Sequence, residues 1–381
     1  MKEYDRIQIQ DICSRICSGG TPKSTVEKYY GGNIPWLNTK EVNFNRIHST
    51  ERTITEEGLQ NSSAKWIDEN AVIVAMYGAT AGKSAISKIR LTTNQACCNL
   101  NIDPDKADYR FVYYALYNDY SRLASLANGG AQQNLNAMQI KEFEIPYPSI
   151  EEQTAIANFL SALDDKIEVN RQINDNLEQQ ASSLLSDWIS TYPCRTYKLS
   201  DICKYANAKC ETGNLTPQNY ISTENMLPNK KGIVEASNIP TGKATCYKVD
   251  DVLIANIRPY FQKIWKADIN GGCSADVLCI RANIESHSPI LYWLLHQDAF
   301  FEYVMTGAKG CKMPRGDKQH IMNWSIDLPE VQYWADLATQ LGSIDQQIAY
   351  NRIESINLSN LRDTLLPKLM SGELKINEID C

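Results

Sequence analysis

A heptad pattern of side chains across residues 156–188 constrains the fold of this 381-residue chain more than any other feature. Neither proline nor glycine interrupts the run, so the segment can stay helical, and a 4-3 repeat keeps one stripe of a helix facing a partner helix. The pattern therefore predicts a long helix with a helical partner. The seam positions are Ile156, Leu160, Leu163, Ile167, Asn170, Asn174, Leu177, Ala181, Leu184 and Trp188.

The same pattern returns 181 residues later in the chain, without a gap. Residues outside the seam recur at the same spacing, because Pro148 matches Pro329 and Asp164 matches Asp345. Two unrelated amphipathic helices would not share these extra matches, so the chain contains an internal repeat. The second seam consists of Leu337, Leu341, Ile344, Ile348, Asn351, Ser355, Leu358, Arg362, Leu365 and Leu369.

Two matching seams predict that the helices pair with each other as an antiparallel coiled coil. Apolar side chains at this spacing are far more often core than ligand sites, and we interpret both seams as helix-pairing core. The equivalent Asn170 and Asn351 are expected to fix the helix register at some cost in stability. A rod of about 35–40 helical residues is roughly 50–60 Å long, which suits a spacer between two units.

The segments that precede the two helices each mix strands with helices, so the predicted fold class is α+β. Residues 71–76 and 252–255 are apolar runs of the buried-strand type, and residues 109–126 form an amphipathic helix. We predict a globular domain over residues 1–148, a spacer helix over 149–190, a second globular domain over 191–328, and a second helix with a tail over 329–381. The plan has a pseudo-two-fold repeat.

Charge is distributed unevenly along the chain, whose formal net charge is −7. Residues 149–190 hold 2 basic and 8 acidic side chains, whereas residues 191–328 hold 16 basic and 13 acidic ones. The acidic faces of the helices repel DNA, and their exposure favours a protein partner or plain solvation. Whether phosphates bind depends on the local field of the near-neutral globules and not on the total charge. The excess of basic over acidic residues in these globules is small.

Targeting signals and metal motifs are both missing from the sequence pattern. No apolar run approaches the roughly 20 residues that span a bilayer, and the polar start is not a signal peptide. We therefore expect a cytoplasmic protein. The twelve cysteines form no CxxC pair, and the four histidines lack ligand spacing. We expect reduced, mostly buried thiols, no metal and no cofactor.

Several motifs occur in a fixed order along the whole chain. They are Ser-Gly-Gly-Thr-Pro at 18–22, Gly-Asn-Ile-Pro-Trp at 32–36, Ile-Pro-Tyr-Pro at 145–148 followed by Glu152-Gln153, Tyr-Ile-Ser-Thr-Glu-Asn-Met at 220–226, Asn-Ile-Arg-Pro-Tyr at 256–260, and Leu-Arg-Asp-Thr-Leu-Leu-Pro-Lys-Leu-Met-Ser-Gly-Glu-Leu at 361–374. In these motifs the chain resembles the specificity subunits of Type I restriction–modification systems. The sequence departs from an exact repeat at Gln332-Tyr333, where the first copy has Glu151-Glu152.

The resemblance implies a non-catalytic subunit with two target-recognition domains, each of which reads one half of a split sequence in double-stranded DNA. It also implies that the helices dock methyltransferase (modification) subunits and that the full enzyme adds restriction (motor-nuclease) subunits. Two readers at the ends of a spacer suit duplex DNA, whose half-sites lie about 34 Å apart per helical turn.

Candidate DNA contacts are polar residues close to predicted turns, because Gln and Asn bond base edges in pairs and Lys and Arg bind phosphates. Each of them is equally well explained as a solvated surface side chain. The basic, turn-rich segment 309–315 is the most persuasive. The candidates in the first globule are Lys40, Tyr77, Lys83, Gln132, Gln133 and Asn134; those in the second are Thr223, Asn225, Arg258, Tyr260, Lys263, Lys309, Lys312 and Arg315.

Three other functions are conceivable from short motifs or from the helices. The glycine turn 78–84 resembles a nucleotide-binding P-loop, but it has three residues between its glycines where the motif needs four, and a strand-like segment follows it. The segment Asn33-Ile34-Pro35-Trp36 is only faintly similar to the catalytic loop of adenine methyltransferases, and no glycine-rich cofactor strand accompanies it. The alternative that stays open is a helical protein–protein adaptor without DNA contact.

Overall fold

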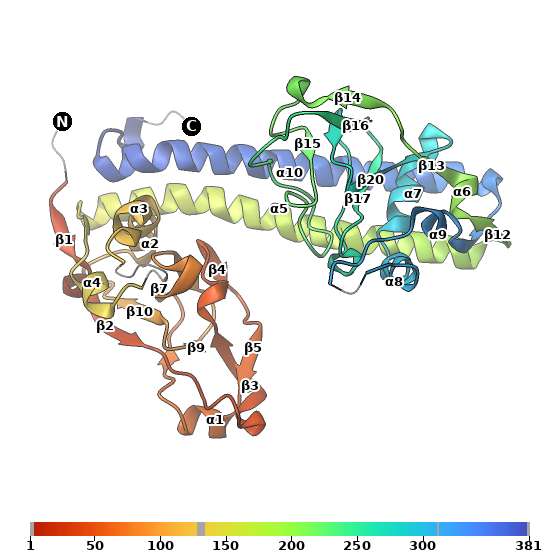
Figure 1. The fold of residues 1–381 in the computed structure, drawn as a ribbon. Coiled ribbons are helices and arrows are strands. Elements are labelled where there is room, and N and C mark those ends of the chain that lie inside the picture. Colours follow the sequence, from red (N-terminus) through yellow and green to blue (C-terminus); the bar gives the residue numbers. More distant parts are fainter. Residues whose placement is uncertain (1–3, 128–133, 311, 379–381) are drawn as a thin grey trace. The chain divides into compact units, whose positions relative to one another are not determined.

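The computed structural model describes residues 4–127, 134–310 and 312–378. The chain forms two compact units, one made of residues 1–168 with 355–381 and the other of residues 169–354 (Figure 1). Two long helices, α5 (Ile150–Thr191) and α10 (Trp334–Ser371), each contribute residues to both units. The predicted boundaries between globules and helices stay a prediction, because the two units divide the chain within the helices.

The first unit contains two sheets and a short strand pair. The five-stranded sheet has the order β2 (Cys13–Ser18), β10 (Cys97–Ile102), β7 (Val72–Ala75), β8 (Ser84–Ser87), β4 (Asn45–Ile47). The four-stranded sheet has the order β5 (Arg52–Ile54), β3 (Tyr30–Leu37), β9 (Leu91–Thr93), β6 (Trp66–Ile67). Strands β1 (Arg6–Gln8) and β11 (Glu144–Pro146) pair antiparallel. The helices are α1 (Glu56–Gln60), α2 (Tyr109–Asn118), α3 (Tyr120–Ala124) and α4 (Ala137–Lys141).

The second unit repeats much of this topology, although the first of its two sheets has four strands instead of five. One sheet has the order β13 (Cys203–Tyr205), β20 (Val277–Ala282), β17 (Val252–Ala255), β18 (Ile264–Lys266). The other has the order β14 (Lys209–Glu211), β16 (Lys243–Tyr247), β19 (Gly271–Cys273), β15 (Tyr220–Ile221). Strands β12 (Cys194–Lys198) and β21 (Ser325–Pro329) form the antiparallel pair. The helices are α6 (Leu199–Ile202), α7 (Ser288–Leu295), α8 (Asp298–Thr306) and α9 (Lys318–Met322). The α+β class and the internal repeat are confirmed.

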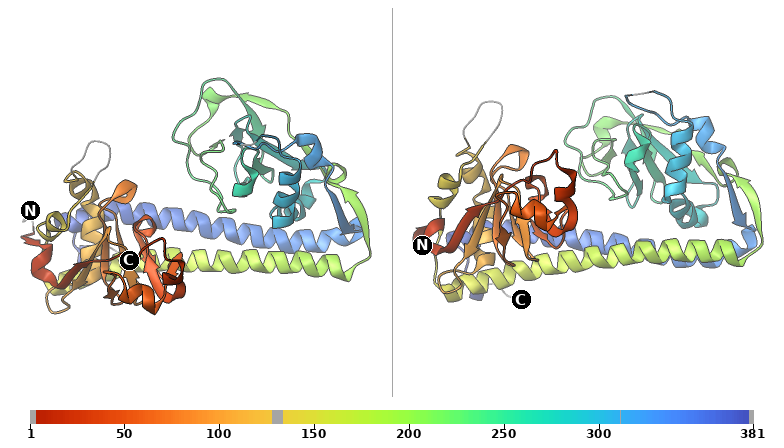
Figure 2. Two further views of the ribbon diagram at one scale, coloured as in Figure 1. Left: turned by 60° about the horizontal axis from the view of Figure 1, so that its bottom comes forward. Right: turned by 90° about the horizontal axis from the view of Figure 1, so that it is seen from below.

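Helices α5 and α10 lie side by side within each unit (Figure 2). In the first unit Leu160, near the start of α5, belongs to the same core as Leu369, near the end of α10. In the second unit Trp188, near the end of α5, belongs to the same core as Leu337, near the start of α10. The early part of one helix thus packs with the late part of the other in both units, which confirms the antiparallel pairing.

Every seam position of both helices is buried or partly buried. The buried stripe is wider than the predicted seam, because Leu185 and Leu366 are 0% and 3% exposed, whereas the preceding seam residues Leu184 and Leu365 are only partly buried. These two additional positions are themselves 181 residues apart. A straight helix has 3.6 residues per turn and drifts from a 3.5-residue repeat, so neighbouring positions join the stripe.

Asn170 and Asn351 meet in the buried helix interface of the second unit. The Asn170 amide donates to the Asn351 carbonyl at 3.4 Å and to a Glu354 carboxylate oxygen at 2.7 Å. The Asn351 amide in turn donates to the Asn174 side-chain oxygen at 2.8 Å. Each bond forms only at one axial position of the two helices relative to each other, so the geometry suits the proposed role of the asparagines in fixing the helix register.

We expect Asn351→Ala to lower the free energy of unfolding by about 1–2 kcal/mol, because it removes the hydrogen bond that the Asn351 amide donates to the partly buried Asn174 side chain. Chemical denaturation followed by circular dichroism measures the change. Asn357→Ala, at an exposed position of the same helix, is the matched control and should shift stability by less than about 0.5 kcal/mol. Equal effects of the two substitutions would contradict a specific role for Asn351.

The predicted helix over residues 109–126 is wrong in its length. The chain forms two helices there, α2 and α3, and the break lies at Asp119. The Asp119 carboxylate accepts hydrogen bonds from the Arg6 and Arg122 guanidinium groups at 3.0 and 2.7 Å. Because Arg6 lies on a distant strand, sequence periodicity alone did not reveal this break.

Candidate nucleic-acid interface

Two segments of the second unit are joined through their backbones and together carry most of its candidate residues. Residues 256–263 follow strand β17, and residues 309–316 follow helix α8. The Arg258 N–H donates to the Pro314 carbonyl at 2.7 Å, and the Gly316 N–H donates to the Asn256 carbonyl at 3.1 Å. We call these two segments the second turn pair; residue 311 lies outside the described part of the chain.

Backbone conformation in the first of these segments is unusual. Arg258 and Gln262 have φ values of 51° and 49°, in the left-handed region that side chains other than glycine rarely adopt. Between them a turn, Pro259–Phe261, leaves Tyr260 48% exposed and Phe261 37% exposed. A strained turn that displays aromatic rings beside an exposed arginine is typical of a binding surface.

The second segment is a basic hairpin. The Lys309 and Arg315 backbones exchange two hydrogen bonds of 2.9 Å, and Gly310 provides the positive φ of 103° that the turn needs. The Lys309 ammonium contacts the Asp317 carboxylate at 2.6 Å, a contact that raises the pKa of Lys309. Lys312 and Arg315 are exposed, and Arg315 also forms an ion pair with Asp276 at 3.1 Å. The hairpin thus carries three cations on its surface.

The acidic residue at the base of the hairpin is held in its charged form. The Asp317 carboxylate accepts from the Lys309 ammonium and from the backbone N–H groups of Gln319 and His320 at 2.9 and 3.1 Å. These bonds lower the pKa of Asp317 to about 2. Asp317 therefore anchors the start of helix α9 and the hairpin together.

The first unit has an equivalent arrangement, which we call the first turn pair. Its segments are residues 76–83, after strand β7, and residues 134–135, before helix α4. Tyr77 and Asn134 form a β-bridge, and the Leu135 N–H donates to the Met76 carbonyl at 2.8 Å. The structure thus brings together Tyr77 and Asn134, two candidates far apart in the sequence. Gln132 and Gln133 lie outside the described residues.

The glycine turn of the first unit connects two antiparallel strands, β7 and β8. Gly78 and Gly82 have φ values of 76° and 84°, and the Gly82 N–H returns to the Ala75 carbonyl at 2.8 Å. A phosphate-cradling P-loop needs a helix after the turn, whereas Ser84–Ser87 is a strand. The Lys83 ammonium contacts the Asn43 side chain at 2.6 Å at the exposed edge of this turn.

The remaining candidates lie outside the two turn pairs or make contacts within the chain. Lys40 is exposed and forms an ion pair with Glu51. The Lys263 ammonium donates to the Thr223 carbonyl at 2.6 Å, and burial lowers its pKa. Asn225 is 4% exposed and takes no part in the surface. Its amide group donates to two backbone carbonyls and its oxygen accepts from a backbone N–H, so the side chain shapes its own loop, and we exclude it from the interface.

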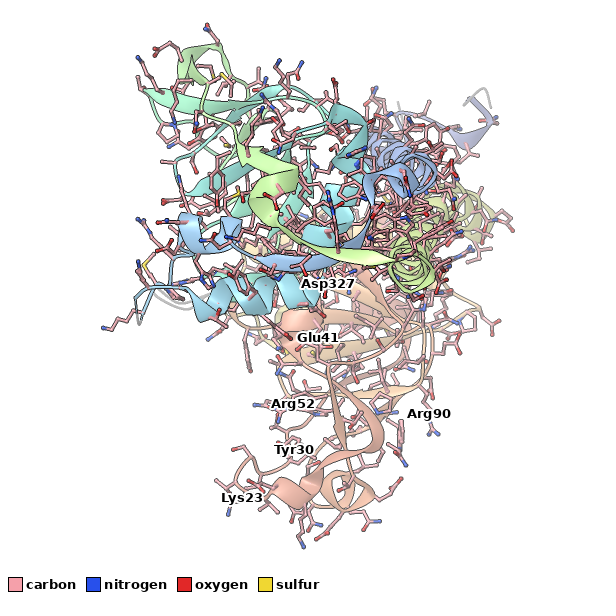
Figure 3. All side chains as sticks on the ribbon, turned by 90° about the vertical axis from the view of Figure 1, so that its right-hand side faces the viewer. Lys23, Tyr30, Glu41, Arg52, Arg90 and Asp327 are labelled. Atoms are coloured by element: carbon pink, nitrogen blue, oxygen red, sulfur yellow. The ribbon has the colours of Figure 1, made fainter. Side chains whose placement is uncertain are left out.

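The sequence analysis missed cationic side chains stacked on aromatic rings in the first unit. The Arg52 guanidinium lies 4.8 Å from the centre of the Tyr30 ring, and the Arg90 guanidinium lies 4.6 Å from that of Trp66. Both arginines belong to the smaller sheet or its edge and are exposed (Figure 3). Stacked arginine–aromatic pairs suit contacts with nucleic acid. The partners are 22 and 24 residues apart, so no local motif signalled them.

Among residues 4–127, 134–310 and 312–378, no helix combines the length and the apolar character that crossing a bilayer requires. Within these same segments, no group of three or more histidine, cysteine or acidic side chains is placed to hold a metal ion.

Comparison with known proteins gives a consistent result. Residues 1–179 match the family described as the Type I restriction modification DNA specificity domain. The specificity subunit of the MjaIX Type I restriction enzyme of Methanocaldococcus jannaschii is 27% identical over 425 aligned positions, which cover 99% of this chain and 95% of that protein. The specificity subunit of EcoR124I/EcoR124II of Escherichia coli is 30% identical over 38% of this chain and 37% of its own length.

A solved structure shares the fold. The S subunit of a Type I restriction–modification system from M. genitalium superimposes with a TM-score of 0.58, at 20% sequence identity, over 96% of both chains. At this identity the likeness concerns the fold alone. The fold of two mixed units joined by long helices is therefore one that a known S subunit adopts.

Proposed function

Because this chain belongs to the specificity subunits of Type I restriction–modification systems, we propose that it selects the DNA sequence on which such a system acts. The chain itself supplies recognition, and the chemistry belongs to its partners. The observation that carries the proposal is the duplication: each unit presents a turn pair at the equivalent place, after β7 in one and after β17 in the other. Two equivalent readers fit a split DNA site.

We propose that exposed side chains of the two turn pairs contact the DNA. Lysine and arginine side chains bind phosphates and thereby position the protein, while arginine and asparagine side chains read base edges in the major groove. In the second turn pair Arg258, Lys309, Lys312 and Arg315 combine these abilities with the exposed ring of Tyr260. In the first turn pair, Lys83 would bind a phosphate, Asn134 would read a base edge, and Tyr77 supplies the exposed aromatic ring.

The long helices are proposed to bind the protein partners, which are methyltransferase and restriction subunits. Apolar side chains remain exposed on both helices, among them Val169 and Ile173 on α5 and Tyr350 and Ile353 on α10. Exposed apolar side chains in the company of acidic ones suit a protein surface better than DNA. A system that methylates genomic DNA places the chain in the cytoplasm.

The proposal is tested by mapping methylated adenines in cells that carry the methyltransferase subunits, with and without this chain. We expect one split sequence to be methylated only when the chain is present. Alanine at Arg258 and Arg315 should relax one half of that sequence, and alanine at Tyr77 and Lys83 the other half. A complex that contains the chain but methylates without sequence preference would overturn the proposal.

A further inference from the structure

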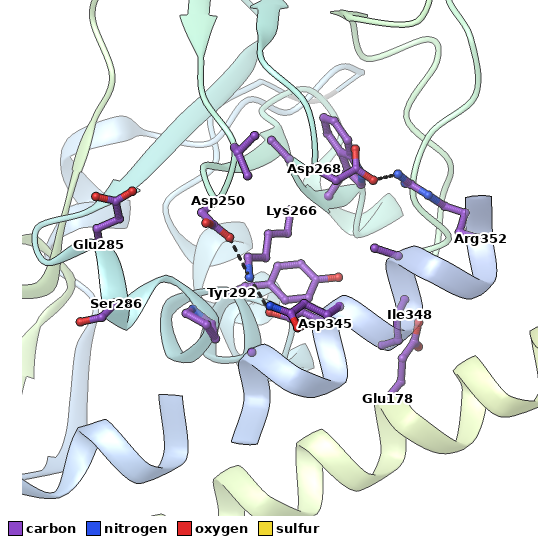
Figure 4. Close-up of a pocket in the computed structure, with 17 residues that line it drawn as sticks. Glu178, Asp250, Lys266, Asp268, Glu285, Ser286, Tyr292, Asp345, Ile348 and Arg352 are labelled. Carbon is purple, nitrogen blue, oxygen red and sulfur yellow. Dashed lines mark hydrogen bonds and ion pairs between the residues drawn. The ribbon is translucent and has the colours of Figure 1, made fainter. Parts of the chain in front are cut away.

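A pocket of about 720 Å³ lies within the second unit (Figure 4). Its walls come from the β17–β18 region, from the start of helix α7, and from helices α5 and α10. All of its lining residues fall between 178 and 352, so the pocket belongs to one compact unit. Its volume is in the range of sites that hold small organic molecules. None of the candidate DNA contacts lines it.

Part of the pocket wall is apolar. Trp265 and Val249 contribute from the strand side, Pro289 from helix α7, and Ile348 and Ala349 from helix α10. Val249 is 47% exposed, whereas Trp265 is buried. A wall of this kind gains free energy when a ligand brings carbon atoms against it.

The two basic residues of the pocket already have carboxylate partners. The Lys266 ammonium lies 3.0 Å from an Asp250 oxygen and 2.5 Å from an Asp345 oxygen. Arg352 forms an ion pair with Asp268. The lining holds five acidic residues against these two bases, so its net charge is negative. An anionic ligand would meet no unpaired cation in this wall.

Some polar groups of the pocket have no hydrogen-bond partner among the residues that the structure describes. They include the buried Nε of Arg352, the carboxylate of Glu178, on helix α5, and the hydroxyl of Tyr292, on helix α7, and all three residues line the pocket. Burial, with a smaller contribution from Asp175, raises the pKa of Glu178 to about 7. An unpartnered carboxylate in a partly buried site is costly, and a bound cation removes that cost.

We propose that the pocket binds a small aliphatic diamine. One ammonium group would be held by the Glu178 carboxylate with the Tyr292 hydroxyl as a second acceptor, and the carbon chain would lie against the apolar wall. Glu285 lies at the opposite side of the pocket from Glu178 and is exposed, so the second ammonium would lie in a pocket whose lining carries a net negative charge (Figure 4). The proposal does not depend on DNA recognition.

Titration calorimetry of the full chain with hexane-1,6-diamine, without DNA and at constant ionic strength, tests this proposal. We expect saturable binding of one diamine per chain. The uncharged hexane-1,6-diol, which has the same carbon chain, should give no saturable heat. Absence of saturable diamine binding, or equal binding of the diol, would overturn the proposal.

Variants distinguish specific diamine binding in the pocket from non-specific attraction of a cation to an acidic protein. Glu178→Gln should weaken diamine binding by about tenfold or more, because it removes a charged hydrogen-bond acceptor. Tyr292→Phe keeps the ring and should weaken binding by a smaller factor. Glu302→Gln removes an exposed carboxylate outside the pocket and should leave the affinity unchanged. Unchanged affinity in both pocket variants would overturn the proposal even if the chain binds diamines elsewhere.

Discussion

Replacing Lys309, Lys312 and Arg315 with alanine is expected to weaken binding of the full chain to duplex DNA and to make that binding less sensitive to salt. Each cation that neutralises a phosphate releases counterions, and the slope of log K against log salt falls by about 0.9 per lost contact. At 0.1 M salt this corresponds to a loss on the order of tenfold per contact. Fluorescence anisotropy of labelled DNA over a salt series measures both quantities.

A variant of the same net charge provides the control for this experiment. Lys198, Lys204 and Lys243 are exposed in the same unit but lie outside the second turn pair, so their replacement by alanine changes the total charge equally. If the hairpin contacts phosphates, the control loses much less affinity than the hairpin variant. Equal losses would mean that only the overall field matters. No loss in either variant would favour the helical adaptor without DNA contact.

The repeat and the helices could be predicted from the sequence because their signals are local or strictly periodic. Heptad spacing is visible residue by residue, and a shift of 181 positions compares the two halves directly. Buried strands such as β7 and β17 are short apolar runs that need no partner to be recognised. The fold class, the antiparallel helices and the pseudo-two-fold plan followed from these patterns.

The candidate site could be predicted only in part, because it is built by contacts between distant segments. Nothing in the sequence shows that the backbone of Arg258 pairs with that of Pro314, or that Tyr77 pairs with Asn134. Residues near turns could be selected from the sequence, but a buried amide that shapes a loop, such as that of Asn225, looks the same in sequence as an exposed one. Turn residues therefore indicate the region of a candidate binding surface, whereas the tertiary contacts decide which of their side chains are exposed on it.

The internal repeat also extends to a pair of buried carboxylates that connect globule and helix. Asp164 accepts hydrogen bonds of 2.6 Å from the Tyr114 hydroxyl of helix α2 and from the Arg362 guanidinium of helix α10. Asp345, 181 residues later, accepts from the Trp293 indole of helix α7 at 2.8 Å and from the Lys266 ammonium at 2.5 Å. In each unit an aspartate of a long helix thus bonds to a side chain of the globule.

Asp164→Ala is expected to lower the free energy of unfolding by about 3 kcal/mol, because it leaves Arg362, whose side chain is 15% exposed, without its buried carboxylate partner. Asp164→Asn should cost less, since the amide oxygen still accepts from Tyr114. Urea unfolding followed by circular dichroism measures the change. As control, Asp175→Ala removes an exposed ion pair with Arg171 on the same helix and should cost less than about 0.5 kcal/mol.

The equivalent substitution Asp345→Ala tests whether each aspartate anchors its own unit or whether such substitutions destabilise the helix pair in general. It leaves Lys266 with the more exposed Asp250, just as Asp164→Ala leaves Arg362 with the more exposed Asp363, so the two substitutions should cost similar amounts. Because Asp164 and Asp345 lie in different units and share no partner, the two losses should add in the double variant. A loss below about 1 kcal/mol for Asp164→Ala would mean that apolar packing alone holds the first globule to its helix.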